Sequence, residues 1–554
     1  MEEARTARRT LGALVLVWLA CTALNVGKAA HVDDGAHLLI AEHIARDPLH
    51  PMSGEVFWDQ DAAAPIHHLN QPHLFFYLLA GIGALSGGST IAMQLGLSLF
   101  VALAIASFRA LYVRLVGERG VVAASALFFL GPAFVPGQNL MTDAPLLSLW
   151  LAFLWALIDA RGERRVPGLA IAGSLLGVAL LVKYTTLALL PVLALDLWRE
   201  RDRARAWLVA LGIPLAVLAA WSAFNVWDYG GVHLIGRHAG SAGELSALES
   251  LGVTLGRAVL FTLTLGAIAP FTLALAPRLG ARRGALLALV VIALAAGTQL
   301  VATQVPQMQD EAAGTSVLRA LFLVSGIAIG GVALASLRAR PEREAMLMFA
   351  AAVSTTLFVV VLSPFVAVRH AMLVLPALLL IALRDARLRD ALEAPLGRAA
   401  IALTVVIGVL LAVSDRRWAE TYRAEASHLR DSEGTVWVIG HWGWQWYASR
   451  EGAYAYEPGT SRIVSGDRIV RPWLVAQPVI AEPDMQCLVR EARHEIAATP
   501  LDLLRTTTAH QGYYAVWEGL PWTLSTAPVE VFERYRFECA GAGTVRSARR
   551  TSHR

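Results

Sequence analysis

Two adjacent carboxylates, Asp33 and Asp34, follow the first long apolar run of the chain, within His31-Val32-Asp33-Asp34-Gly35-Ala36-His37. A carboxylate can accept the proton of a hydroxyl and so act as a general base. Because an ionised acid in or near hydrocarbon costs roughly 2 to 4 kcal/mol, such acids usually serve a function or face a wet cavity. The structural alternative is that both acids cap a helix at the membrane surface.

Cations stand in comparable places beside apolar runs. The chain has only two Lys: Lys28 shortly before the acids, and Lys183 at the turn between two apolar runs. Arg369, followed by His370, lies at the edge of another run. A cation at an apolar turn is unfavourable unless it meets an anion, and a lipid phosphate is a suitable one. The alternative is that Lys183 and Arg369 extend along apolar surface to reach water.

Asp143 adds a third acid at the start of an apolar run. The orientation derived below places it on the same face of the membrane as Asp33, Asp34, Lys183 and Arg369. Acids that activate a hydroxyl and cations that hold a phosphate are what glycosyl transfer from a lipid phosphate requires.

Composition shows what must position these residues. Of 554 residues, 56% are hydrophobic and only 16% are charged, whereas a soluble domain has about a quarter charged residues. Apolar runs such as 11–24, 286–296 and 399–413 recur, and a helix needs roughly 20 mostly apolar residues to cross a membrane. The net charge of +4 comes from short Arg clusters between these runs, which argues against nucleic-acid binding.

The Arg clusters set the orientation, because cytoplasmic loops carry the Arg and Lys. Arg5 to Arg9 place the N-terminus inside, and the acidic segment 31–73 then lies outside. The apolar piece 74–85 is too short to cross unaided and is interpreted as a juxtamembrane or re-entrant helix. Thirteen spans are predicted: 11–30, 90–116, 120–136, 143–160, 167–182, 184–198, 206–225, 253–276, 284–303, 316–337, 345–362, 370–384 and 398–414.

The chain becomes polar and mixed after residue 414. Residues 435–439 read as a buried strand, and the length is sufficient for a small α/β domain. Cys487 and Cys539 form either a disulfide, as an oxidising exterior permits, or two separate buried thiols. The predicted fold is a mostly α, polytopic membrane bundle (residues 1–414, with an outer loop at 31–89) followed by an extracytoplasmic α/β domain (415–554).

Five segments, in this order, resemble the landmarks of GT-C fold glycosyltransferases that use polyprenyl-phosphate sugars. Within that fold the chain is similar to the dolichyl-phosphate-mannose protein mannosyltransferases and the bacterial aminoarabinose transferases of lipid A. The resemblance covers residues 10–415. Its segments are the Asp33-Asp34 pair, Asn70-Gln71-Pro72-His73-Leu74 to Leu78, Met141-Thr142-Asp143-Ala144-Pro145 to Leu147, Leu181-Val182-Lys183-Tyr184 to Thr186, and Ala367-Val368-Arg369-His370-Ala371 to Pro376.

The resemblance implies roles for these residues. Asp33 or Asp34 is expected to deprotonate the acceptor hydroxyl in an inverting single displacement, and the first acid of the pair is the one that the family uses as the base. Lys183, Arg369, Asp143, His73 and Asn70 are expected to bind substrate. The chain departs from the family in two places: the pair is usually Asp-Glu, and relatives have Pro-Pro-Leu, sometimes after Glu-Lys, where this chain has residues 70–74.

The segment 31–73 holds seven His and seven acids, which are residue types that bind divalent ions. No close spacing such as His-Glu-x-x-His is present. Catalysis is therefore expected to need no cofactor, although a divalent metal stays an alternative. Aromatic residues at 442–447 and 513–522 could stack on sugar rings or pack a core.

The sequence thus predicts a multi-pass protein of the inner (cytoplasmic) membrane, with its N-terminus in the cytoplasm and its C-terminal domain outside. Its expected partners are the bilayer, a polyprenyl-phosphate sugar donor and an envelope acceptor (protein, lipid or glycan). Two alternatives stay open: a transporter or flippase of amphiphilic solutes, and a catalytically silent scaffold. A transporter would favour paired halves with interrupted helices in matching positions, and the sequence has no such duplication.

Overall fold

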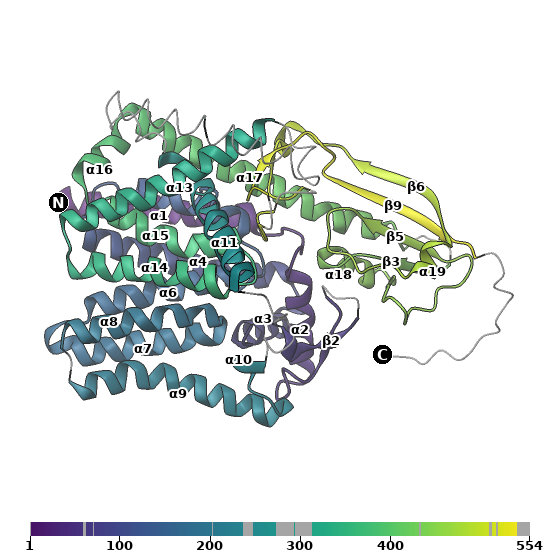
Figure 1. The fold of residues 1–554 in the computed structure, drawn as a ribbon, viewed down its shortest axis with the longest axis horizontal. Coiled ribbons are helices and arrows are strands. Elements are labelled where there is room, and N and C mark those ends of the chain that lie inside the picture. Colours follow the sequence, from purple (N-terminus) through teal and green to yellow (C-terminus); the bar gives the residue numbers. More distant parts are fainter. Residues whose placement is uncertain are drawn as a thin grey trace.

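The structure is a computed structural model that describes residues 2–58, 62–69, 71–201, 203–236, 247–272, 293, 313–430, 434–508, 512–516 and 519–539. It is mostly helical, with a sheet at one end (Figure 1). Within these residues, eight helices are long and apolar enough to cross a membrane. They are α1 (Glu2–Asn25), α4 (Thr90–Leu115), α7 (Arg165–Val182), α9 (Ala204–Tyr229), α11 (Ala247–Ala267), α13 (Ala313–Ala339), α14 (Arg343–Leu362) and α17 (Pro395–Ser427).

Shorter helices fill the spaces between the long ones. They are α2 (Asp34–Arg46), α3 (Leu74–Ser86), α5 (Val121–Phe129), α6 (Asp143–Asp159), α8 (Leu190–Arg199), α10 (His233–Gly236), α15 (Val368–Ala382) and α16 (Ala386–Glu393), with 3-10 turns η1 (Ile66–His68), η2 (Val135–Gly137) and η4 (Tyr184–Leu189). Three of them begin at or beside a charged residue discussed above: α2 at Asp34, α6 at Asp143 and α15 next to Arg369.

The predicted number of thirteen spans is not confirmed. The span expected at 120–136 ends as α5, because Gly131 and Pro132 interrupt the helix. The span expected at 184–198 divides into η4 and α8, and α6 and α15 are shorter than 18 residues. The span expected at 284–303 lies outside the described residues.

Small residues let neighbouring helices approach closely, which is how apolar helices associate in lipid. In α11 and α13, a Cβ added at Gly266 would lie 1.7 Å from the carbonyl oxygen of Phe322. One added at Gly326 would lie 2.0 Å from that of Thr262. The backbones therefore touch at this crossing, and larger side chains would push the two helices apart.

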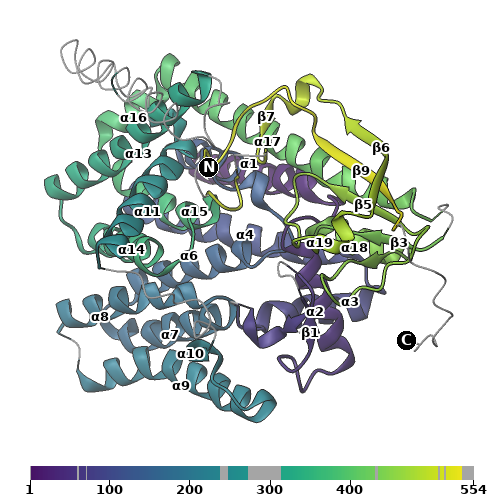
Figure 2. The ribbon, with the colours of Figure 1, turned by 45° about the vertical axis from the view of Figure 1, so that its right-hand side comes forward.

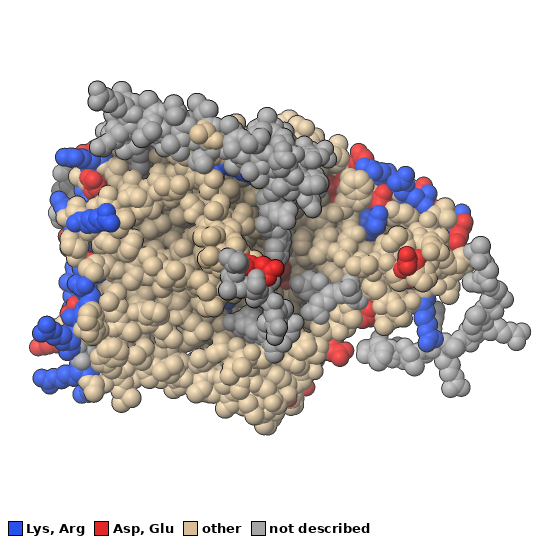
Figure 3. Space-filling view, in the orientation of Figure 1, with Lys and Arg blue, Asp and Glu red and all other residues tan. Residues whose placement is uncertain are grey.

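The basic loops of the bundle meet at one end of it. Asp196 is fully buried and binds Arg165 and Arg343 at 2.8 and 2.7 Å, while Glu344 binds Arg114 and Arg161. In Figure 3, Lys and Arg gather at the end of the bundle opposite the sheet, and the flank between is almost free of charge. The described Arg clusters that were predicted to share one side of the membrane therefore lie together, while the cluster at 278–283 lies outside the described residues.

The described residues of 34–86 form a small unit beside the bundle, with α2 packed on α3 and the two-stranded β1 (Glu55–Val56) and β2 (Ala64–Pro65) next to them (Figure 1). The helix expected over 74–85 forms as α3. Its residues Phe75, Phe76 and Leu79 are buried with Ile40 and Ile44 of α2. This apolar contact fixes the helix that begins at Asp34.

The C-terminal residues form a five-stranded sheet in the order β4-β3-β5-β9-β6, parallel at β4-β3-β5 and antiparallel at β5-β9-β6. The strand expected over 435–439 forms as β3. Two short helices accompany the sheet. The elements are β3 (Val436–Val438), α18 (Trp442–Arg450), β4 (Tyr454–Ala455), β5 (Arg468–Pro472), α19 (Glu482–Met485), β6 (Leu488–Ile496) and β9 (Glu530–Phe537).

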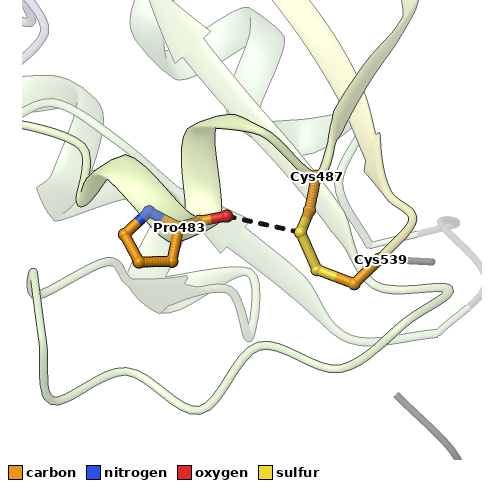
Figure 4. The surroundings of a disulfide bond; sticks show 3 residues. All are labelled: Pro483, Cys487 and Cys539. Atoms are coloured by element: carbon orange, nitrogen blue, oxygen red, sulfur yellow. Dashed lines mark hydrogen bonds between the residues drawn. A yellow bond between two sulfur atoms is a disulfide. The ribbon is translucent and has the colours of Figure 1, made fainter. Parts of the chain in front are cut away.

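Cys487 and Cys539 form a disulfide that joins the start of β6 to the residues after β9, with Cα atoms 4.7 Å apart (Figure 4). Of the two alternatives left open by the sequence, the structure has the disulfide. Cys21, the third Cys of the chain, is buried and free.

One part of the C-terminal region leaves the sheet and enters the helical bundle. This segment, called the C-terminal insertion here, comprises the described residues between β7 (Leu504–Arg505) and β8 (Thr523–Leu524), with the two strands themselves. Figure 2 shows β7 beside α17. Trp522 packs on Phe322 of α13 and donates to the carbonyl oxygen of Ala267 at 3.0 Å. The insertion thus packs against α11, α13 and α17.

Candidate active site

Four charged side chains come together where helices begin or end near the sheet. Asp33 immediately precedes α2, Asp143 is the first residue of α6, Lys183 follows the last residue of α7, and Arg369 is the second residue of α15. Acids are favoured at helix N-termini, where unpaired N–H groups carry partial positive charge. Local sequence therefore explains where the acids lie, and packing brings them to the cations.

The four residues form two ion pairs. Arg369 Nη1 lies 3.2 Å from Asp33 Oδ2, and Lys183 Nζ lies 3.1 Å from Asp143 Oδ1. The pairs are neighbours, since the charge of Arg369 acts on Asp143 and that of Asp33 acts on Lys183. The sequence placed these four residues on one face, and the structure brings them into a single neutral cluster, called the charged cluster here.

The two adjacent acids have different surroundings. The side chain of Asp33 is 26% exposed, whereas that of Asp34 is 3% exposed. Asp34 Oδ2 accepts from the backbone N–H of His31 at 3.3 Å, and its Oδ1 is buried with no partner among the described residues. Only Asp33 is open to a molecule that enters the site.

A pocket of about 280 Å³, including the open space at its mouth, adjoins the charged cluster. Its wall is apolar and aromatic apart from the two charged residues at one side. Arg369 Nε is buried beside it and has no hydrogen-bond partner among the described residues. The lining consists of Ala133, Gly137, Met141, Asp143, Arg369, Met372, Tyr513 and Tyr514.

A second, fully enclosed network lies behind the acids and centres on Asp415 of α17, which has no exposed surface. Its Oδ2 accepts from Lys28 Nζ at 2.5 Å and from His31 Nε2 at 2.9 Å. Tyr514 and Thr506 donate their hydroxyls to Asp415 at 2.7 and 2.5 Å. Burial and Lys28 push the pKa of His31 down, but the carboxylates of Asp415 and Asp34 outweigh them, so that pKa is raised.

Val32 lies in the sequence between His31 of the enclosed network and Asp33 of the charged cluster, and its backbone conformation is unusual. Its φ is +49°, a left-handed conformation that is strained for a β-branched residue. The loop around it is held by side chains from distant elements. Tyr447 OH accepts from the N–H of Ala30 at 2.8 Å, and Gln94 Oε1 accepts from that of Gly27 at 2.7 Å. Tertiary contacts therefore impose the conformation that presents Asp33.

Two further residues, Asn70 and His73, were predicted to bind substrate. Asn70 lies outside the described residues. His73 is fully buried against the rings of Phe76 and Trp221, at 5.0 and 6.3 Å, and no hydrogen bond or ion pair of the described residues joins it to the charged cluster. Its expected contact with substrate stays a prediction.

Lys28 has a different place from Lys183. Its side chain is 2% exposed and also donates to Asn139 Oδ1 at 2.7 Å and to the carbonyl oxygen of Pro136 at 3.1 Å. All its hydrogen-bonding capacity is used inside the protein. Lys183, at 13% exposure, borders the open site.

Sequence reasoning did not identify Asp415 or Thr506, and it named Tyr514 only among the aromatic residues of 513–522 that could stack on sugar rings or pack a core. Asp415 could have been found, because it is an acid directly after the apolar run 399–413, as Asp33 is after the first run. The contacts of Thr506 and Tyr514 with Asp415 could not, since they depend on how the C-terminal insertion folds back.

No group of three or more His, Cys, Asp or Glu that could hold a metal ion occurs in the part of the chain that the structure describes. Several His of the outer segment have other partners there: His67 stacks on Tyr229 at 4.4 Å and His50 on Trp227 at 5.1 Å. That catalysis needs no metal or other cofactor stays a prediction.

The fold and the site together define a class: a polytopic, mostly helical membrane protein with a charged site at one end of its helices. Residues 70–227 match the sequence model of the family described as dolichyl-phosphate-mannose-protein mannosyltransferase. This match confirms the resemblance stated from the motifs. The matched residues include Asp143 and Lys183, while Asp33 and Arg369 lie outside them.

Solved structures that are similar to this chain include those of three glycosyltransferases. ArnT from Cupriavidus metallidurans bound to undecaprenyl phosphate is 15% identical, with 85% of this chain and 96% of that chain covered and a TM-score of 0.42. The archaeal oligosaccharyltransferase AglB from Archaeoglobus fulgidus is 14% identical, with 80% and 64% covered and a TM-score of 0.42.

The arabinofuranosyltransferase AftD from Mycobacteria is 14% identical, with 97% and 42% covered and a TM-score of 0.40. These TM-scores are too low to support a functional conclusion. No curated protein matches the chain.

The buried pair of Lys28 and Asp415 yields a prediction about stability. Lys28→Met leaves Asp415 without its strongest counter-charge, and breaking a buried ion pair costs about 3–5 kcal/mol. We expect a clearly lower unfolding temperature in detergent, and partial recovery in the double variant Lys28→Met/Asp415→Asn. The control is Lys183→Met, whose partner Asp143 keeps the charge of Arg369 nearby. Equal loss in both single variants, or no recovery in the double variant, would contradict this account.

Proposed function

We propose that this chain is a glycosyltransferase that moves a sugar from a polyprenyl-phosphate donor to a hydroxyl of an envelope acceptor. The observation that carries the proposal is the charged cluster, where an accessible carboxylate, Asp33, lies beside two cations at the end of apolar helices. The family match over residues 70–227 supports the same reaction class.

Asp33 is the proposed general base, because it is the accessible member of the acidic pair. Arg369 contacts its Oδ2, which fixes the carboxylate next to the site of reaction. General-base assistance of this kind accelerates a reaction roughly a hundred- to ten-thousand-fold. Asp34, which is enclosed, has a supporting role.

The reaction is a single displacement. The acceptor oxygen forms a bond to the anomeric carbon as the bond from that carbon to the phosphate oxygen breaks, so the configuration inverts. The acceptor proton passes to Asp33, and the electron pair of the broken bond leaves on the polyprenyl phosphate. Lys183 and Arg369 stabilise that growing negative charge. The unpartnered Arg369 Nε gives the guanidinium a donor in addition to the one on Asp33.

The proposed orientation places the charged cluster and the sheet outside the cytoplasm, with residues 415–554 as an extracytoplasmic domain and the N-terminus inside. The basic loops gather at the opposite end of the bundle, as cytoplasmic loops do. The Cys487–Cys539 disulfide supports this assignment, since disulfides persist in oxidising compartments. The membrane is the inner membrane, where polyprenyl-phosphate sugars are presented.

The test of the proposal is transfer of a radiolabelled sugar from polyprenyl-phosphate donors in proteoliposomes. We expect Asp33→Asn to reduce transfer at least a hundredfold, because Asn keeps the size of Asp but cannot accept the proton. Asp34→Asn should reduce it less. Asp47→Asn, at the exposed far end of the same helix, is the matched control and should retain full activity. Absence of transfer by the wild type from every donor would favour a transporter or a scaffold.

A second prediction concerns the leaving phosphate. Arg369→Ala and Lys183→Ala should each raise the KM for the donor or lower kcat by about tenfold or more, because each removes a cation from the leaving group. Arg369→Lys should recover only part, since an ammonium cannot reproduce a bidentate guanidinium. Arg257→Ala is the control, as Arg257 contacts the carbonyl oxygen of Pro364 in the loop before α15. Unchanged kinetics in both Ala variants would remove these cations from the site.

A third prediction concerns orientation. A single Cys introduced at Thr460, exposed near the sheet, should react with a membrane-impermeant thiol reagent in spheroplasts. One introduced at Arg164, exposed in the basic end, should react only after the membrane is opened. The native background is favourable, because Cys21 is buried and the other two Cys are paired. The opposite labelling pattern would reverse the orientation.

A further inference from the structure

The C-terminal insertion reaches the candidate site, where Tyr513 and Tyr514 line the pocket. The sequence suggested for its aromatic residues only sugar stacking or core packing. Its described residues 512–516 lie against the loop that leads into α15. Val516 N–H donates to the carbonyl oxygen of Val366 at 2.7 Å, and Val368 N–H donates to that of Tyr513 at 3.1 Å. Arg369 is the next residue, so the insertion and α15 are joined by backbone hydrogen bonds at the charged cluster.

The two tyrosines of the insertion make different contacts. The Tyr513 hydroxyl donates to the carbonyl oxygen of Pro132 at 2.9 Å, at the break after α5. The Tyr514 hydroxyl donates to Asp415 Oδ2 at 2.7 Å, accepts from Asn139 Nδ2 at 3.0 Å and lies 3.2 Å from His31 Nε2. Both side chains are buried, but only Tyr514 belongs to the Asp415 network.

His31 carries the effect of Tyr514 toward the acids. One ring nitrogen, Nε2, is held by Asp415 at 2.9 Å, and the other, Nδ1, lies 3.7 Å from Asp34 Oδ2. The ring of His31 meets the ring of Tyr514 edge to face at 5.5 Å. The imidazole is therefore wedged between Tyr514, Asp415 and Asp34, directly before the strained Val32 and the base Asp33.

We propose that Tyr514 is a positioning residue for the acidic pair: with Asp415 it locks the imidazole of His31, and through it the loop that presents Asp33 to the acceptor. The proposal rests on the proposed function for its kinetic consequence. It also has a structural consequence that does not depend on activity, namely the rigidity of residues 28–34. The hydroxyl of Tyr514 is engaged by Asp415, Asn139 and His31, so its effect is proposed to reach the reaction through His31.

A matched control is Tyr422 of α17, which is fully buried, does not line the pocket and donates its hydroxyl to the buried carboxylate of Glu530 at 2.8 Å. Tyr514→Phe and Tyr422→Phe each remove one buried hydroxyl from a carboxylate and leave the ring in place, so both should lose similar thermal stability. We expect kcat of Tyr514→Phe to fall about tenfold while the KM for the donor stays within about twofold, because the donor's cations are untouched. Tyr422→Phe should keep both constants within about twofold of the wild type.

Amide hydrogen exchange supplies the readout that does not depend on activity. Residues 28–34 should exchange about tenfold faster in Tyr514→Phe than in Tyr422→Phe. Thr506→Val, which removes the other hydroxyl on Asp415, serves as a second variant if Tyr514→Phe does not fold, and should reproduce both changes. Equal kcat and equal exchange in the two tyrosine variants would overturn the proposal while leaving the glycosyltransferase intact. A wild type without transfer, but with the expected exchange difference, would overturn the proposed function alone.

Discussion

The carboxylate of Asp415 is the constraint on which the rest of the site depends. A carboxylate with no exposed surface is stable only if hydrogen bonds and opposite charges replace water. Asp415 obtains them from four donors: Lys28, His31, Thr506 and Tyr514. These donors belong to the loop after α1 and to the C-terminal insertion, while Asp415 itself belongs to α17. Satisfying one buried charge therefore requires three distant parts of the chain to meet.

The charged cluster depends on these three parts of the chain being brought together, but it is less buried than Asp415. The loop after α1 ends at Asp33, and the insertion is hydrogen-bonded to the residues before Arg369, so both members of that ion pair are placed by segments tied to Asp415. In the enclosed network, Asp415 accepts from Lys28, His31, Thr506 and Tyr514 together. The charged cluster, in contrast, borders a pocket and retains an unpartnered nitrogen on Arg369. The buried network around Asp415 thus positions the charged cluster, which is open to the pocket.

Sequence reasoning could find the members of the charged cluster because each is a charge beside an apolar run, which is rare and costly in a membrane protein. It could not tell Asp33 from Asp34, since their difference in exposure arises from His31 and the packing of α2. It overestimated the spans at α5 and α8, where hydropathy continues but backbone breaks at Gly131-Pro132 and in η4 end the α-helix. The contact of Tyr514 with Asp415 could not be predicted, because the two residues are 99 positions apart and only tertiary folding joins them.

The continuity of α17 has a geometric consequence. A helix of 33 residues is about 50 Å long, whereas the hydrocarbon core of a bilayer is about 30 Å thick. With α17 along the membrane normal, about 20 Å of it projects beyond the hydrocarbon. The C-terminal part of α17 packs on α18 (Figure 1). Because α17 is one continuous helix, it holds the sheet at a fixed distance from the membrane surface. Bilayer thickness would then set how far from the membrane surface an acceptor is met.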